Sequence, residues 1–199
     1  MDLSKVKIFG NEYDQRDLER AVNIESRNTA AVDLYQQLFF GQLGVSYCIS
    51  VNHATTLAKA FNERGINAAV ISGRQKKKEQ REILKKFKKG DLLMLCNAII
   101  LTEGFDEPKA NVCLNLSPTL SPVKAEQRAG RVLRLAPDNP DKYAYVVDFL
   151  DQSHDRKRQP ITFAEIIQGA EAIKTGSFPL LNQENEFFRF LNLGFKFQA

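Results

Sequence analysis

The sequence predicts an α/β fold with an open, mostly parallel sheet that is covered by helices on both faces. Short, continuously apolar runs alternate with amphipathic helical patterns along the 199 residues. Strands that are apolar throughout suit a parallel sheet, because both faces of such a sheet are buried. The composition, with 43% hydrophobic and 26% charged residues, fits one compact domain and an extension.

The first half of the chain supplies two helices and two strands. Apolar residues at helical spacing predict a helix at 27–40, with Ser26 as its N-cap and Gly41 as its stop. A strand at 45–51 precedes a helix at 54–64, and a short strand follows at 68–71. The inward face of the second helix is expected to hold Ala54, Leu57, Ala58 and Phe61.

The second half completes the sheet. A helix is expected at 75–89, with Ile83, Leu84 and Phe87 as its apolar stripe. Strands are expected at 92–96, 112–116 and 143–149. Right-handed crossovers bring the carboxyl ends of parallel strands to one edge. We therefore expect the functional segments that follow the strands to meet at that edge.

Residues 127–134 place three arginines and a glutamine on one segment without an acidic residue. As a helix at about 100° per residue, the segment puts Gln127, Arg131 and Arg134 within an arc of roughly 60°, with Arg128 at its edge. Arginine suits phosphate oxygens because its rigid fork of donors binds them in pairs. A basic amphipathic helix with a solvated face is the alternative interpretation.

A second segment, residues 101–108, follows an apolar run that is typical of a buried strand. Its polar members include Glu103 and Asp106, and Asp106 could accept a hydrogen bond from a sugar hydroxyl. Gly104 permits close approach of a ligand or backbone. Such a turn after a strand is where open α/β sheets bind ligands, although an ordinary surface turn has the same composition.

In this order, the two segments resemble motifs V and VI of superfamily-2 helicases and translocases. Residues 47–54 resemble motif IV, and residues 71–73 resemble the short strand-end motif that follows it. The resemblance covers roughly residues 16–150 and is closest to the XPB-like, type I restriction-like and mitochondrial branch-migration-like branch. It implies the C-terminal RecA-like domain of a DEAD/DEAH-type ATPase.

The resemblance also implies roles for the two segments. Arg131 and Arg134 would be arginine fingers on the γ-phosphate of ATP, while Gln127 and Arg128 would couple the nucleotide to domain closure. Residues Glu103, Gly104 and Asp106 would lie near the nucleotide, with Asp106 near its ribose and Gly104 near either the nucleotide or the nucleic-acid backbone.

An absence limits what this chain is expected to do alone. Motors of this class bind ATP and Mg²⁺ mainly through a first RecA-like domain, which carries a Gly-x-x-x-x-Gly-Lys-Ser/Thr loop and an Asp-Glu-x-Asp/His box. Neither pattern occurs in these 199 residues. The chain is therefore expected to be inactive by itself and to work with that missing N-terminal domain.

Nucleic acid is the expected macromolecular partner. Residues 74–89 hold nine basic residues against two acidic ones, a density that suits phosphate contact, although a solvated charged face is the alternative. In related motors Thr-Asp often stands where this chain has Asn97 and Ala98, and this departure argues mildly for a duplex-DNA translocase over a DEAD-box RNA helicase. The resemblance assigns nucleic-acid contacts to Ser50, Asn52, Arg74, Lys76, Lys77, Asn97 and Thr102.

Composition also sets expectations for the ends and the compartment. Residues 1–15 are expected to be a connector, 16–151 the RecA-like domain, and 152–199 a mostly helical extension. Residues 161–199 hold seven of the fourteen phenylalanines, which must pack on the domain or on a protein partner. Three cysteines without a Cys-x-x-Cys pattern indicate buried thiols in a reducing, cytoplasmic location.

Other classes find less support in the sequence. No apolar run reaches the length of a bilayer span, and the two histidines are too far apart along the chain to favour a metal site. The main rival is a catalytically inactive module that keeps the helicase fold and binds nucleic acid or a protein. A nucleotide-binding domain acting alone would need a phosphate loop, which the glycine spacing does not provide.

Overall fold

The computed structural model describes residues 1–98, 108–134, 142–149 and 159–166, together with residues 151, 153 and 155. It also describes the backbone of residues 173–181 and 187–196.

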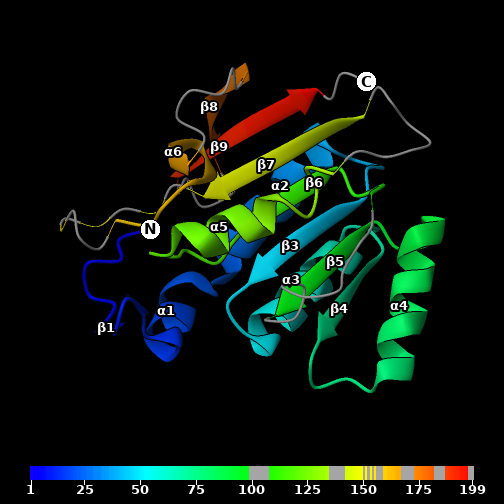
Figure 1. The fold of residues 1–199 in the computed structure, drawn as a ribbon, viewed down its shortest axis with the longest axis horizontal. Coiled ribbons are helices and arrows are strands. Elements are labelled where there is room, and N and C mark those ends of the chain that lie inside the picture. The colour runs from blue at the N-terminus through cyan, green and yellow to red at the C-terminus, as the bar shows by residue number, and fades with distance from the viewer. Residues whose placement is uncertain are drawn as a thin grey trace.

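A parallel five-stranded sheet forms the centre of the molecule (Figure 1). Its strands, in spatial order, are β4 (Ala68–Ser72), β5 (Met94–Ala98), β3 (Gly44–Cys48), β6 (Val112–Asn115) and β7 (Tyr143–Phe149). Every described residue of β3, β5 and β6 is buried. The predicted α/β fold with a buried parallel sheet is therefore confirmed.

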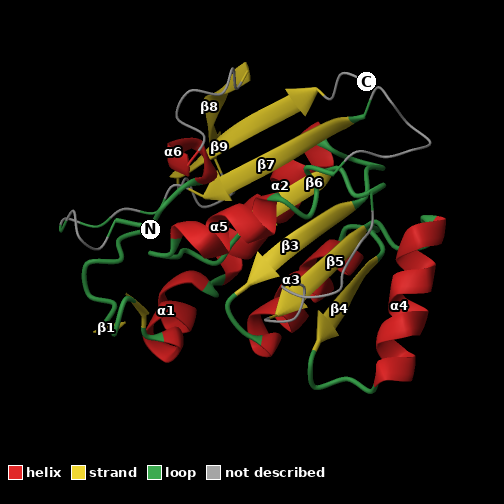
Figure 2. Cartoon of the chain, in the orientation of Figure 1, coloured by secondary structure: helices red, strands yellow, loops and turns green. Residues whose placement is uncertain are grey.

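Helices cover both faces of this sheet, as expected (Figure 2). On one face lie α2 (Glu25–Leu38) and α3 (Val51–Glu63), and on the other lie α4 (Lys77–Lys89) and α5 (Pro122–Ala129). The inward residues expected for the helix at 54–64 are all buried. On α4, Phe87 is buried and the rest of the stripe, Ile83 and Leu84, is half-buried.

Helix boundaries differ in detail from the expectation. Helix α3 begins earlier than expected, because the Ser50 hydroxyl accepts a hydrogen bond from the His53 amide at 3.0 Å and caps it. Helix α2 begins at Glu25 with Ile24 at the N-cap position and no side-chain cap, so the expected role of Ser26 is wrong. Helix α4 ends at Lys89, and Gly90, with a φ of 82°, forms its left-handed C-cap.

The first 22 residues form structure that the sequence pattern does not reveal. Strands β1 (Ile8–Phe9) and β2 (Glu12–Tyr13) make a small hairpin, and α1 (Gln15–Val22) follows. The Asp14 side chain caps α1 by accepting from two backbone amides. These elements share a small apolar cluster with the end of β3, comprising Leu3, Val6, Tyr13, Leu18, Val22 and Ile49.

The described part of residues 152–199 contains more strand than helix, which differs from the expected helical extension. Helix α6 (Phe163–Ile166) is short, whereas β8 (Ile173–Leu181) and β9 (Phe187–Lys196) form an antiparallel pair that joins the sheet beside β7. Phenylalanine favours strands, and Gly176 and Pro179 within β8 oppose a helix. Tail packing against the domain is the alternative that this pairing favours.

The core contains the three cysteines and one buried ion pair. Cys48, Cys96 and Cys113 are free and buried, as expected. Arg27 donates two hydrogen bonds to the Asp151 carboxylate, and both side chains are 1% exposed.

Among the described residues, no helix is long and apolar enough to cross a membrane. The same residues hold no group of three or more His, Cys, Asp or Glu side chains placed to bind a metal.

Candidate functional site

The segment at 127–134 is helical only at its beginning. Helix α5 ends at Ala129, and the Gly130 amide donates to the Glu126 carbonyl at 2.8 Å before the chain turns. The expected helix through Arg134 is therefore wrong beyond Ala129, and the predicted arc does not describe Arg131 and Arg134. Glycine disfavours helix by about 1 kcal/mol relative to alanine, which explains the end at this point.

The apolar side of the segment is nevertheless as expected. Ala129 and Val132 are fully buried, and Leu133 is half-buried. Gln127 is exposed on α5, and Arg131 and Arg134 are half-buried in the turn that follows. The turn therefore keeps the two arginines at the surface although it is not helical.

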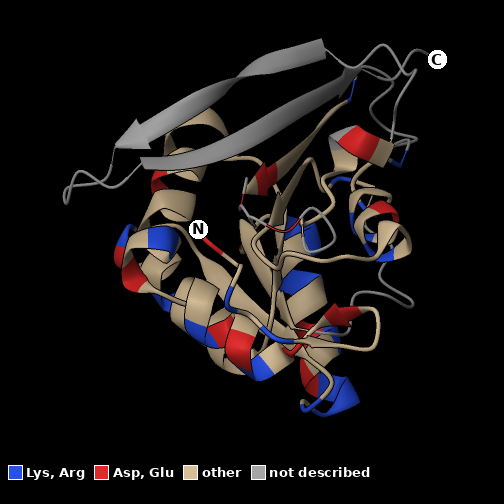
Figure 3. Ribbon diagram, turned by 90° about the vertical axis from the view of Figure 1, so that its left-hand side faces the viewer, with Lys and Arg blue, Asp and Glu red and all other residues tan. Residues whose placement is uncertain are grey.

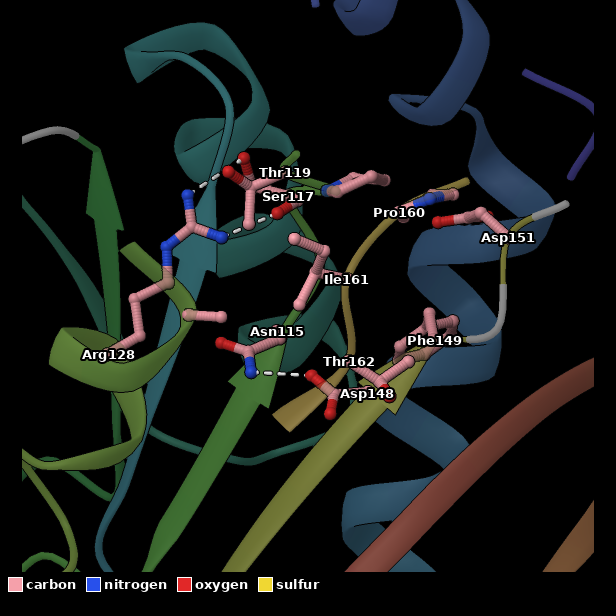
Figure 4. A pocket seen from close by; sticks show the side chains of 12 residues that line it. Asn115, Ser117, Thr119, Arg128, Asp148, Phe149, Asp151, Pro160, Ile161 and Thr162 are labelled. Atoms are coloured by element: carbon pink, nitrogen blue, oxygen red, sulfur yellow. Dashed lines mark hydrogen bonds between the residues drawn. The ribbon is translucent and has the colours of Figure 1, made fainter. Parts of the chain in front are cut away.

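Arg128 has an internal role. Its Nη1 donates to the Ser117 carbonyl at 2.6 Å and its Nη2 lies 3.4 Å from the Ser117 hydroxyl (Figure 4). The guanidinium also lies over the Tyr47 ring, 5.7 Å from the ring centroid. Burial lowers the pKa of Arg128, and the chain just beyond β6 is tied to α5 by these bonds.

The arginine end of the segment lies away from the carboxyl edge of the sheet. The buried ammonium of Lys142 donates to the carbonyls of Val132 and Arg134, each at 2.8 Å, and to that of Pro108 at 2.6 Å. Lys142 directly precedes β7, so these groups meet at the amino end of that strand. The expectation that both segments meet at the carboxyl edge is wrong for this end, because α5 runs back along the sheet.

Most of the segment at 101–108 lies outside the described residues, and so do four predicted site residues. These are Thr102, Glu103, Gly104 and Asp106. Its last residue, Pro108, is described and accepts from Lys142.

The polar residues after β3 are held by an acidic side chain from α1. The Glu19 carboxylate accepts from the Ser50 hydroxyl at 2.6 Å and from the Asn52 amide at 3.0 Å. Partial burial raises the pKa of Glu19, but these hydrogen bonds outweigh burial and hold the pKa below its usual value. The Glu19 carboxylate therefore binds two of the side chains to which the resemblance assigns nucleic-acid contacts.

The other predicted nucleic-acid residues that the structure describes lie near the same edge with different exposures. Arg74, Lys76 and Lys77 are exposed between the end of β4 and the start of α4. Asn97 lies in β5 and is 1% exposed. Because β5 lies between β4 and β3, the strand order brings the ends of these three strands together.

Charge is mixed over the side of the molecule shown in Figure 3. Basic and acidic positions alternate along the helices there. The run of exposed basic residues on and before α4 is thus a local feature of a chain whose net charge is only +4.

Comparison with known proteins decides the family. A family model described as the helicase conserved C-terminal domain matches residues 29–136, more than half of the chain. The chain belongs to this family. The expected membership in the superfamily-2 helicases is therefore confirmed.

The helicase C-terminal domain has relatives among longer proteins. It is 29% identical over 162 residues to a Saccharomyces cerevisiae protein named as the ATP-dependent helicase IRC3. The matching stretch covers 76% of this chain and 22% of that protein. It is 30% identical over 134 residues to a 51.5 kDa protein of a Lactococcus phage, covering 67% of this chain and 29% of that protein. The chain thus spans less than a third of the length of either relative.

Solved structures share its fold. The C-terminal domain of the DEAD-box protein Dbp5 superposes with a TM-score of 0.52 at 18% identity, covering 68% of this chain and 74% of that domain. A structure of S. cerevisiae Dbp5 bound to Gle1 and IP6 gives a TM-score of 0.51 at 20% identity, covering 65% of this chain and 33% of that one. The expected RecA-like fold is confirmed.

A cavity of about 350 Å³ opens in the helicase C-terminal domain near the carboxyl ends of β3, β5 and β6. Tyr47, which is 4% exposed, lines it, and its hydroxyl has no hydrogen-bond partner among the described residues. Side chains of the amino-terminal hairpin and α1, including Glu12 and Gln15, form another wall. Sequence patterns missed these residues, because the short hairpin carries no periodic signal.

A smaller cavity of about 20 Å³ lies beside Arg128 (Figure 4). Asp148 lines it and accepts from the Asn115 amide group and the Phe163 backbone amide, both at 2.7 Å. Burial raises the pKa of Asp148, partly offset by these hydrogen bonds. This carboxylate therefore joins β6, β7 and α6. A cavity of this volume has room for little more than one water molecule.

Proposed function

We propose that this domain is the second RecA-like half of an ATP-dependent nucleic-acid helicase or translocase. In that reading ATP and Mg²⁺ bind mainly to a first motor domain outside this chain, and this domain completes the site. Homology to proteins named as ATP-dependent helicases supports the proposal. The intact protein would work inside the cell, which suits its buried free thiols.

The observation that carries the proposal is the turn after α5. It presents two half-buried arginines, Arg131 and Arg134, from a backbone whose carbonyls are bound by Lys142. Two permanently charged guanidinium groups on an anchored backbone fit a polyphosphate, because bidentate donors on a rigid support lose little freedom on binding. Arginine fingers of this kind contribute roughly 10³–10⁵ in rate, on the order of 4–7 kcal/mol.

The remaining predicted residues take supporting roles in the proposal. Gln127 would contact the nucleotide, and Arg128 would transmit closure to β6 through Ser117. Glu103, Gly104 and Asp106 would contribute to the nucleotide side of the domain.

Nucleic acid would lie along the carboxyl ends of β4, β5 and β3. The exposed cations Arg74, Lys76 and Lys77 would contact phosphates there, where counterion release favours binding. Ser50, Asn52, Asn97 and Thr102 complete the proposed contact set. We propose duplex DNA as the substrate, with RNA as the alternative that binding assays distinguish.

Substitution of Arg131 tests the nucleotide half of the proposal. In the chain joined to its upstream region, Arg131→Ala should abolish nucleic-acid-stimulated ATP hydrolysis while ATP binding persists, because the finger acts on developing charge rather than on ground-state binding. Steady-state hydrolysis and fluorescent-nucleotide titration measure the two effects. Arg64→Ala, which removes an arginine paired with Asp33 at the end of α3, is the control.

Unchanged turnover in Arg131→Ala would refute the finger assignment. The rival function is tested by comparing hydrolysis, with and without duplex DNA, for this chain alone and for the joined form. No hydrolysis in either form, with salt-sensitive nucleic-acid binding retained, would instead identify a binding module that keeps only the fold.

A further inference from the structure

Lys142 is a charged side chain in an unusual position. It is 1% exposed, and it stands directly before β7, in the interior of the sheet between β6 and β9. Burying an ammonium is costly unless its protons are bound. Hydrogen bonds to the ammonium must therefore compensate for its loss of hydration.

All three protons of the Lys142 ammonium have an acceptor. They are directed at the main-chain carbonyls of Pro108, Val132 and Arg134, at 2.6, 2.8 and 2.8 Å. An ammonium has three donors and no acceptor, so these bonds use its full capacity. Charge-assisted bonds of this kind are stronger than those between neutral groups.

The three acceptors come from two segments that the proposed function joins. Pro108 is the last residue of the motif V segment, and Val132 and Arg134 belong to the motif VI segment. Helix α5 ends at Ala129, and the last helix-like bonds run from the amides of Val132 and Leu133 to the Ala129 carbonyl, so the carbonyls of Val132 and Arg134 lie beyond them and need other donors. Lys142 supplies those donors from a strand that packing holds in place.

We propose that Lys142 is a positioning residue that fixes the main chain carrying Arg131 and Arg134 and links it to the end of motif V. The proposal rests on the proposed function for its catalytic consequence, but its structural part is independent of it. Lys142 itself contacts neither nucleotide nor nucleic acid. It sets where the arginines stand, and a displacement of about 1 Å at a reacting centre can cost a hundredfold in rate.

The first arm of the test measures positioning without activity. Hydrogen exchange is followed in the intact protein for Lys142→Met, which keeps the length of the side chain and removes its charge. We expect faster exchange of the amides at 131–134 and unchanged exchange in α3. Lys59→Met, which removes an exposed lysine from α3, is the matched control. Unchanged exchange at 131–134 would overturn the proposal, whatever the protein's activity.

The second arm measures catalysis in the same variants. Lys142→Met should lower kcat for ATP hydrolysis between about tenfold and a hundredfold, with KM and the dissociation constant for duplex DNA changed less than about threefold. A general loss of structure would instead lower DNA binding and kcat together, and that result would overturn the proposal. Faster exchange with kcat equal to that of Lys59→Met would overturn the catalytic consequence.

A second variant covers the case in which Lys142→Met does not fold. Lys142→Arg keeps the charge and the donors, but its planar fork cannot aim three protons at the same three carbonyls. It should fold and show a smaller fall in kcat at unchanged KM, and a kcat equal to the control would overturn the proposal. Arg131→Ala, assayed in parallel, shows separately whether the proposed function itself fails.

Discussion

Arg27, Arg128 and Lys142 are basic side chains that the fold uses internally. Arg27 binds Asp151, Arg128 binds Ser117, and Lys142 binds three carbonyls. A sequence shows that these residues are cationic but not which of their partners will be buried with them. The sequence therefore predicts where the arginines lie along the chain. It does not predict the contacts of Arg128 and Lys142, because their hydrogen-bond acceptors lie on other segments of the chain.

His53 is a second buried titratable group, and it gives the domain a pH dependence. Its Nε2 lies 3.0 Å from the Asn28 Oδ1, and its Nδ1 lies 3.4 Å from the Ile49 amide, which suits a neutral ring. Burial lowers the pKa of His53 to about 4, and the nearby charge of Arg27 adds to this effect.

The direction of the pH effect follows from that depressed pKa. The unfolded chain binds the His53 proton near pH 6.5 and the folded chain only near pH 4, so folding stability should fall by about 3 kcal/mol as pH drops through this window. Urea unfolding of the wild type and His53→Gln across pH 4–7 measures the difference. Parallel pH profiles for the two proteins would contradict the prediction.

At the level of elements, the sequence predicted the five parallel strands and helices α2, α3 and α4 well. Strand β7 has the expected bounds, and β3 to β6 lie within a few residues of theirs. Buried parallel strands are continuous apolar runs, so their pattern is strong. The β1–β2 hairpin and α1 were missed because their short apolar pattern is completed only by contact with Ile49 and its neighbours.

Helix α1 places Glu19 against the amino end of α3, where its charge would oppose a phosphate on the proposed DNA path. Glu19→Gln should therefore tighten duplex DNA binding about two- to fivefold at low salt, because it removes a negative charge beside Ser50 and Asn52. Fluorescence anisotropy at several salt concentrations measures this change. Glu63→Gln, an exposed change at the far end of α3, should have no such effect, and equal affinities for both variants would refute the placement of the DNA path.

At the scale of the whole molecule, Glu12 ties the amino-terminal hairpin to the entrance of α5. Its carboxylate accepts from the Thr119 hydroxyl, the Leu120 amide at 2.9 Å and the Lys124 ammonium at 3.2 Å. Burial raises the pKa of Glu12, but these bonds outweigh burial and lower it overall. The hairpin and α5 are thereby expected to open as one unit.

Removing that carboxylate tests whether the two regions are coupled. Glu12→Ala should lower the free energy of unfolding by about 2 kcal/mol and raise hydrogen exchange at residues 120–124, since the amide and ammonium lose their acceptor. Exchange in α3 should not change. Glu63→Ala is the control, and equal exchange at 120–124 in the two variants would show that the hairpin is not required for order at α5.

The position of β5 between β4 and β3 has a consequence for how the chain reaches its native state. Strand β3 and strand β4 follow one another in sequence but do not pair with each other, because β4 pairs with β5 and β3 pairs with β5 and β6. Strands β4 and β5 are joined through α4 alone and can pair locally. Strand β3 can pair only after β5 has been made, roughly fifty residues later in the chain. During synthesis the apolar β3 therefore emerges before its two partner strands exist, and in that interval its unpaired edges are open to misassociation.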